Sequence, residues 1–395
     1  MIELAVLFLR LGATAFGGPA AHIALLEREV VQRRRWLTSE EFLDRVGAAQ
    51  LIPGPNSTEL AIHIGLQRAG AWGLVVAGAC FILPAAVLVT GIAWGYQEYG
   101  QLPRMTAWFY GIKPVLVAIV AQALWGLGRT ALKSTGLGIL AALVTAGSLL
   151  GVHELALLLA AGLLSTAVFH RPKSVANPNA TRALISPPPS VPTSIATSSV
   201  PAAAATSVAA LGAVLAPAPF GLWPLFIFFL KVGSVLFGSG YVLLAFLDAD
   251  LVSRWHWLGR EQLLDAIAVG QFTPGPVFTT ATFVGYLLGG VPGAAVATVG
   301  IFLPAFVFVA LSAPLIPRLR SSPTAGAFLD GVNVASLVLM ALVTVRLGQV
   351  AIVDGFTVAL TLLAGVLLFR TRLNSAWLVL GGALVGGMVR GLAAG

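Results

Sequence analysis

Charged side chains are scarce in this sequence. They account for 10% of its 395 residues, whereas an ordinary soluble domain carries roughly 25%. Hydrophobic residues account for 58%. A chain with so few charges is not expected to fold as a soluble globular protein, so the composition favours a lipid environment.

Cysteine is nearly absent, since Cys80 is the only one. A single cysteine excludes disulfides within the chain, cysteine-based zinc sites and iron–sulfur clusters. The five histidines show no HExxH spacing, and no Walker-type GxxxxGK[ST] segment occurs. No GxSxG elbow or cofactor fingerprint is present. We therefore expect no metal, no cofactor and no enzymatic activity, and we do not expect ATP-driven pumping by this chain alone.

Long apolar runs take the place of these motifs. Each approaches the roughly 20 residues that a helix needs to cross a bilayer. The sequence therefore predicts an all-α polytopic membrane protein with membrane lipid around it. The runs are 70–96, 106–127, 134–152, 155–169, 220–237, 290–315, 325–345, 351–369 and 376–392.

The formal net charge of +8 comes from basic residues scattered over short loops. This pattern is typical of cytoplasmic loops whose charge sets the orientation of a membrane protein. We favour that interpretation over nucleic-acid binding and expect no nucleic-acid partner.

The chain contains a tandem repeat. The segment QLIPGP at 50–55 recurs as QFTPGP at 271–276. We divide the chain into a first transmembrane repeat at 1–169, a linker at 170–219 and a second repeat at 220–395. The linker is rich in Pro, Ala and Ser, so we expect it to be disordered or polyproline-like and cytoplasmic. Other matching positions are Gly12/Gly233, Arg33/Arg254, Trp36/Trp257, Glu40/Glu261, Asp44/Asp265, Gly65/Gly285, Gly70/Gly290 and Gly111/Gly331.

A Pro-Gly-Pro segment cannot continue a helix, because proline lacks the N–H and glycine is flexible. Matching breaks in two membrane halves are typical of a transporter site built from discontinuous helices. Each break is predicted to follow an amphipathic helix, at 39–51 with Ser39 as N-cap and at 260–272. A short helix comes next, at 56–68 and 277–288. The short helices cannot span a bilayer alone, so each pair is predicted to form one re-entrant hairpin per half.

The loop charges predict the orientation of the halves. Placing the basic loops and the linker in the cytoplasm requires the two halves to be inverted relative to each other. Each half then has five spans, about ten in total, and both termini face outward.

These motifs resemble the chromate ion transporter (CHR) superfamily in its long, two-domain form. The resemblance covers nearly the whole chain except the linker, and it implies export of chromate from a bacterial cytoplasm through the inner membrane. It leaves sulfate or another oxyanion open as the substrate. The matching segments are FGGP (16–19), EREVVQRRRWLTSEEFLD (27–44), QLIPGPNSTELAIHIG (50–65), FILPA (81–85), GIKPV (111–115), FGSGYVLLAFL (237–247), QFTPGPVFTTATFVGY (271–286), GIFLPAF (300–306) and DGVN (330–333).

The predicted oxyanion site lies between the two breaks, where helix N-termini offer free N–H groups and positive dipole ends. A structural kink that packs the bundle is the alternative. Candidate substrate-binding residues of the breaks are Pro53, Gly54, Pro55, Asn56, Ser57, Thr58, Pro274, Gly275, Pro276, Thr279 and Thr280. Further candidates are Gly17, Gly18, Gly238 and Gly240, which would form a backbone nest or else a close helix contact.

Three cations within apolar segments are also candidates, because a buried cation in lipid is costly. They are Arg10, Lys113 and Lys231. The alternatives are snorkelling to the headgroups or pairing with Glu3 or Asp330.

We assign gating or structural roles to Arg33, Trp36, Glu40, Asp44, Gln50 and Gln271. The first four and their repeat partners would anchor the chain at the membrane surface and form a gate salt bridge, and the glutamines would bond the unwound backbone. Glu59 could relay protons, but we interpret it as a solvated or helix-capping acid. The predicted mechanism is secondary active transport by alternating access. An anion channel and a scaffold protein remain alternatives, and a homodimer stays open.

Overall fold

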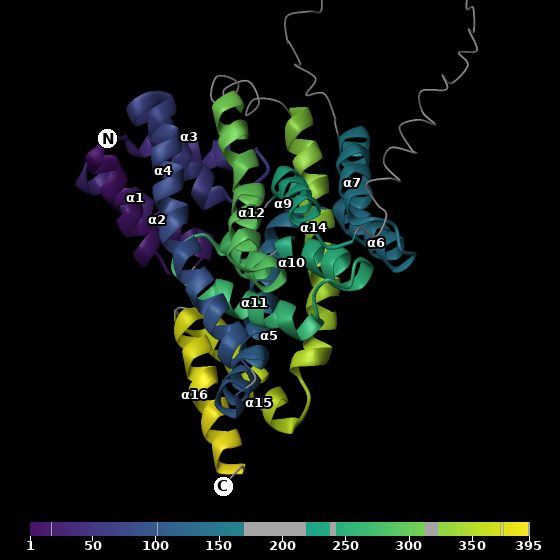
Figure 1. Cartoon of the computed structure of the whole chain (residues 1–395). Helices are drawn as coiled ribbons and strands as arrows, with labels where there is room; N and C mark the ends of the chain where they lie inside the picture. Colours follow the sequence, from purple (N-terminus) through teal and green to yellow (C-terminus); the bar gives the residue numbers. More distant parts are fainter. Residues whose placement is uncertain are drawn as a thin grey trace, which may run out of the picture. The chain divides into compact units, whose positions relative to one another are not determined.

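The computed structural model describes residues 1–16, 18–100, 102–169, 219–237, 242–312, 323–371, 373 and 375–393 (Figure 1). Every regular element among these residues is helical. Met1–His170 and Phe220–Gly395 form one compact unit. The predicted linker lies almost wholly outside the described residues.

The helices follow the same order in both halves. The first half contains α1 (Ile2–Thr14), α2 (Gly18–Glu27), the π-helix η1 (Arg28–Arg33), α3 (Ser39–Ala49), α4 (Asn56–Tyr99), α5 (Pro103–Ala131), α6 (Thr135–Leu149) and α7 (Glu154–Phe169). The second half contains α9 (Leu222–Val235), α10 (Leu243–Phe246), the π-helix η3 (Leu247–Arg254), α11 (Arg260–Phe272), the 3-10 helix η4 (Val277–Thr279), α12 (Thr280–Ser312), α14 (Pro323–Ala351), α15 (Gly355–Arg370) and α16 (Ser375–Ala393).

The repeat extends to unusual backbone conformations. Arg35 and its partner His256 have positive φ angles of 53° and 54°. Gly70 and its partner Gly290 have φ angles of 61° and 60°. Since non-glycine residues rarely adopt positive φ, this agreement fits the tandem repeat predicted from the sequence.

Helices α4 and α12 each consist of two helices joined by a sharp reversal. The reversal in α4 lies at Ala69 and Gly70, which have non-helical backbone angles. A Cβ atom on Gly65 would lie 2.3 Å from the carbonyl oxygen of Gly73, although eight residues of continuous helix would separate them by about 12 Å. The predicted short helix at 56–68 therefore packs back along the helix that follows it.

The two halves exchange their C-terminal helices (Figure 1). Helix α5 of the first half packs on α15 and α16, and α14 of the second half packs on α6 and α7. Gly111 of α5 lies against the backbone of Gly382 in α16, and its repeat partner Gly331 lies against Ala161 in α7. Small residues let these helices approach closely, so the C-terminal helices of each half pack mainly on helices of the other half.

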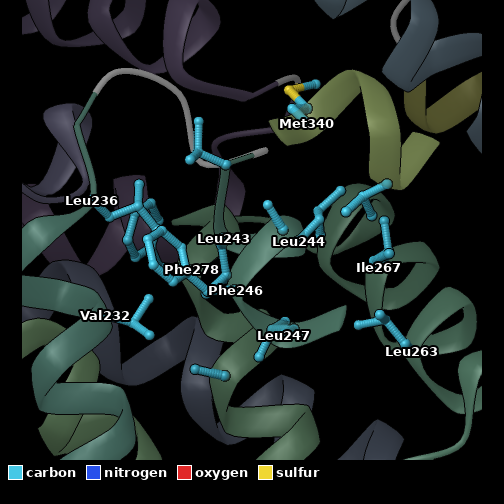
Figure 2. Close-up of a cluster of buried hydrophobic side chains, with 14 of the residues drawn as sticks. Val232, Leu236, Leu243, Leu244, Phe246, Leu247, Leu263, Ile267, Phe278 and Met340 are labelled. Carbon is cyan, nitrogen blue, oxygen red and sulfur yellow. The ribbon is translucent and has the colours of Figure 1, made fainter. Parts of the chain in front are cut away.

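A buried apolar cluster holds the second break in place (Figure 2). Phe278, directly after the break, is 2% exposed. It lies with Phe246 at the end of α10 and Leu247 at the start of η3, and with Val232 and Leu236 at the end of α9.

Four described helical segments are long and apolar enough to cross a membrane: Asn56–Tyr99, Met105–Ala131, Val277–Ser312 and Thr324–Ala351. The runs expected to span at 134–152 and 155–169 form helices of 15 and 16 residues, shorter than the roughly 20 residues of a simple span.

The predicted N-cap of the helix at 39 was wrong by one residue. Thr38 is the N-cap, because its hydroxyl accepts the Glu41 N–H at 3.2 Å and the Glu41 carboxylate accepts the Thr38 N–H at 2.8 Å. This is the Thr-x-x-Glu capping box, a pattern that is readable in the sequence.

Candidate functional site

Each Pro-Gly-Pro break inserts into the opposite half of the chain. The N–H of Gly54 donates to the carbonyl oxygen of Leu236 at 2.8 Å, and the N–H of Gly275 donates to the carbonyl oxygen of Ala15 at 2.9 Å. Ala15 and Leu236 occupy equivalent places, as the C-caps of α1 and α9. The exchange satisfies backbone groups on both sides, as a buried break requires.

Only glycine fits at the centre of each break. Gly54 and Gly275 have φ angles of 138° and 95°, which L-residues rarely adopt. A Cβ on Gly275 would lie 2.5 Å from the Ala85 Cβ and 2.9 Å from the Gly12 carbonyl oxygen. A Cβ on Gly54 would lie 3.6 Å from Ala305, the repeat partner of Ala85.

The second break uses its hydroxyl groups internally. The Thr279 hydroxyl donates to the Pro276 carbonyl oxygen at 2.8 Å, and the Thr280 hydroxyl donates to the Val277 carbonyl oxygen at 2.9 Å. The hydroxyl protons of Thr279 and Thr280 are therefore already used in hydrogen bonds to the backbone. Only backbone groups of this break remain to contact a ligand.

The first break keeps polar atoms without partners. Helix α4 begins at Asn56 with no side-chain cap. The N–H groups of Thr58 and Glu59 donate to the Pro55 carbonyl oxygen at 2.8 and 3.0 Å, which leaves the N–H groups of Asn56 and Ser57 available at the positive dipole end. The Asn56 Oδ1 and the Thr58 hydroxyl have no hydrogen-bond partner among the described residues, and Thr58 is 0% exposed. The Thr58 hydroxyl and these N–H groups can donate to an anion, whereas the Asn56 Oδ1 can only accept a hydrogen bond.

His22 ties this break to the first helix. Its Nε2 lies 3.0 Å from the Ala15 carbonyl oxygen, and its Nδ1 lies 3.3 Å from the Ser57 hydroxyl. A carbonyl oxygen only accepts, so Nε2 carries a proton, and in a neutral ring Nδ1 accepts from Ser57.

Glu59 lies over the first break. It is 0% exposed, and neither carboxylate oxygen has a hydrogen-bond partner among the described residues. A Cβ on Gly54 would lie 2.3 Å from its Oε1. The interpretation of Glu59 as a solvated or helix-capping acid was wrong, because it neither meets solvent nor accepts a backbone N–H. Its repeat partner is Thr279.

Two of the three predicted cations are paired with acids. Lys113 lies 3.4 Å from Asp265 and 3.7 Å from Glu261, and Lys231 lies 2.6 Å from Asp250. Arg10 is exposed on α1. The alternative of pairing with Glu3 or Asp330 was wrong for Lys113 and Lys231: Asp330 pairs with Lys133 at 3.1 Å, and Glu3 lies 3.8 Å from Arg34. Gly18 is the first residue of α2, and Gly17, Gly238 and Gly240 lie outside the described residues.

The predicted gate residues fall into separate clusters. Arg33 pairs with Glu29 at 2.8 Å, while Trp36 stacks under the guanidinium groups of Arg34 and Arg68 at 5.5 and 5.3 Å. Glu40 and Gln50 are exposed, Asp44 is half-buried and Gln271 is buried. The repeat partners Glu261 and Asp265 instead reach Lys113 of the opposite half, and Asp265 also accepts the Tyr96 hydroxyl at 2.7 Å.

Sequence reasoning missed a second polar centre, built on two aspartates of η3 that are 0% exposed. Asp248 pairs with Arg346 at 3.0 Å and Arg260 at 3.4 Å, and Asp250 pairs with Lys231 and Arg254. A cavity of about 350 Å³ beside them is lined by Arg254, Arg346, Glu154, Ser148 and Ser253 among others. The signal was the pair of acids in an otherwise apolar segment. The described cavities include no residue of either break.

The comparisons with known proteins decide the family. The sequence profile of the chromate transporter family matches residues 2–166 and again residues 223–387. The chain belongs to the chromate transporter family. The two matches fit the tandem repeat, and the chain is a multi-pass membrane transporter rather than an enzyme.

Its relatives are similar over nearly their whole length. A chromate transport protein of Cupriavidus metallidurans is 33% identical over 394 residues, covering 97% of this chain and 92% of that protein. One from Pseudomonas aeruginosa is 31% identical, covering 98% and 92%. A probable chromate transport protein of Synechococcus elongatus is 31% identical, covering 92% and 88%. No solved structure matches this chain.

Proposed function

We propose that this family member is a secondary active transporter that exports chromate from a bacterial cytoplasm across the inner membrane. The oxyanion binds at the Pro-Gly-Pro breaks and crosses by alternating access. The observation that carries this proposal is the reciprocal insertion of each break into the other half through Gly54 and Gly275. A site shared by two halves is reorganised whenever the halves move, which is what alternating access needs.

The first break supplies most of the recognition. The N–H groups at the start of α4 and the Thr58 hydroxyl donate to the anion oxygens, and the helix dipole favours its charge. The second break contributes backbone around Gly275 and closes the site from the opposite half. Lys113 and Lys231 act through their acidic partners as structural or gating groups, while Arg10 contributes positive potential along the path.

The proposed topology is an inverted repeat of five spans per half. Reciprocal contacts between equivalent positions support a two-fold relation between the halves, and the loop charges support an axis in the membrane plane. Each break forms the tip of a re-entrant hairpin. The Arg45 side chain of α3 donates to Gln67 of α4 at 3.1 Å, which supports an antiparallel pair on either side of the first break.

The membrane potential acts in the direction that drives an anion out of the cell. An interior-negative potential favours outward movement of negative charge by about 2.3 kcal/mol per charge per 100 mV. A dianion gains twice that amount, so export requires no ATP.

Chromate uptake by everted membrane vesicles tests the proposal, because their outer face is the cytoplasmic one. The intact chain should take up chromate saturably, and an ionophore that collapses the potential should slow uptake. Gly54→Ala and Gly275→Ala should abolish uptake, while Gly91→Ala should not, since a Cβ on Gly91 meets nothing within 4 Å. Sulfate added in excess reports whether other oxyanions share the site. Uptake that survives both break substitutions would refute the proposal.

A further inference from the structure

The carboxylate of Glu59 is the least satisfied polar group at the first break. Its side chain is completely buried, its oxygens have no hydrogen-bond partner among the described residues, and Oε1 lies against Gly54. A buried ionised carboxylate without partners is costly, and in a membrane protein such a group generally marks a proton or ion path.

The surroundings of Glu59 hold few groups that could balance a negative charge. On its own helix lie Asn56, Thr58 and His63, and the Nε2 of His63 also lacks a partner. Across the break, α12 presents the Ala305 methyl group near Gly54, and α9 presents the Leu236 carbonyl oxygen. The other titratable groups near this end of α4 are His22 of α2, engaged with Ser57, and Arg45 of α3, engaged with Gln67.

We propose that Glu59 is a proton-binding site linked to the oxyanion site, so that the anion binds and travels together with one proton. This inference rests on the proposed function, because it deepens the chemistry of the same break. An ionised Glu59 would place a negative charge beside the bound dianion. A protonated Glu59 removes that charge and offers an O–H donor to an anion oxygen.

The balance of the step is simple. At a pH where Glu59 is ionised, its carboxylate takes one proton from solution as the dianion enters, and at lower pH that proton is already bound. No covalent bond to the anion forms, and the proton and the anion are both released on the other side. The net charge carried is therefore one negative charge instead of two. The repeat partner Thr279 cannot bind a proton in this way, so one proton accompanies each anion.

Proton uptake by the purified full chain tests this coupling. A pH-indicator dye in weakly buffered detergent solution reports protons bound when sulfate or chromate is added above neutral pH, where both are dianions. Above the pKa of the linked group, wild type should take up about one proton per anion, and its affinity should fall about tenfold per pH unit. Glu59→Gln should bind the anion with no proton uptake and a flat pH profile. Glu98→Gln is the matched control, because Glu98 is exposed in the second helix of α4, away from the break.

The possible results distinguish failure of the proton coupling from failure of the proposed transport function. Wild-type binding with a flat pH profile and no proton uptake, up to the highest pH at which the protein stays folded, would refute the coupling and leave the proposed function intact. If the anion affinity still depends steeply on pH in Glu59→Gln but not in His63→Gln or His22→Gln, a histidine binds the proton. That result would refute the role of Glu59. Failure of wild type to bind either anion would refute the proposed function itself. Because the wild-type dye measurement needs no substitution, a misfolded variant does not block the test.

Discussion

The N–H of Gly54 donates a 2.8 Å hydrogen bond to the carbonyl oxygen of Leu236, at the end of the first helix of the opposite half. The equivalent bond joins Gly275 to Ala15 at 2.9 Å. Each break is therefore held by the other half as well as by its own helices. Any movement of one half relative to the other must therefore carry or break these two hydrogen bonds.

Gly275→Ala should damage this junction. The added Cβ would meet the Ala85 Cβ at 2.5 Å and the Gly12 carbonyl oxygen at 2.9 Å, and overpacking of this kind costs about 1–3 kcal/mol. The positive φ adds strain. We expect a lower melting temperature in detergent and loss of chromate transport. Gly91→Ala should leave both unchanged, and equal behaviour of the two variants would contradict the importance of the junction.

Thr58→Val should weaken anion binding without harming the fold. The Thr58 hydroxyl has no partner among the described residues, so valine of similar shape removes no protein hydrogen bond. A hydrogen bond to a charged ligand is worth about 1.5–3 kcal/mol, which corresponds to a tenfold or larger loss of affinity in a titration with chromate. Thr90→Val is the control, because Thr90 lies in the second helix of α4 and its hydroxyl donates to the Ala86 carbonyl oxygen. An unchanged affinity in Thr58→Val would remove this residue from the site.

The Lys113–Asp265 pair should show strong coupling in a double-mutant cycle. Their side chains are 16% and 7% exposed, and removing one partner of a buried pair costs about 3–5 kcal/mol. Lys113→Met should therefore lower the unfolding temperature, and adding Asp265→Asn should restore part of it while keeping an acceptor for Tyr96. Lys133→Met, at a pair exposed by 61% and 39%, should cost no more than about 1 kcal/mol. Additive effects at Lys113 and Asp265 would show that the pair does not hold the halves together.

Part of the folding stability should be lost at acid pH because Asp354 becomes protonated. The hydrogen bond from the Tyr110 hydroxyl, and next the bond from the Thr357 N–H, hold the pKa of this N-cap carboxyl below its ordinary value. A lowered folded-state pKa gives stability that is present above the unfolded pKa and lost as pH falls through the folded pKa. Melting temperatures measured across the acid range should fall less steeply for Asp354→Asn than for wild type. Parallel curves for the two proteins would contradict this contribution.

The repeat, the breaks and the local helices were predictable from the sequence. Pro53–Pro55 and Pro274–Pro276 stop a helix for reasons that belong to the residues themselves, and the helix predicted at 39–51 is observed at Ser39–Ala49. The substrate-binding residues remain a prediction, as do the inversion and the number of spans.

The partners of the buried charges were not predictable. Lys113 meets Asp265 because α5 packs beside α11 of the other half, and no pattern within one half specifies that contact. Glu59 resembled a capping acid because it lies near a helix start. Helices α1 and α12 pack on α4, and no pattern around Glu59 specifies those contacts, so its burial is a tertiary property.

The position of bound chromate tests the central claim most directly. Chromium gives an anomalous signal at its absorption edge, so a crystal of the protein grown with chromate would locate the anion. We expect density at the first break, beside Glu59 and within hydrogen-bond distance of the Thr58 hydroxyl and the N–H groups of Asn56 and Ser57. Density confined to the cavity between Arg254 and Arg346, with none at the break, would contradict it.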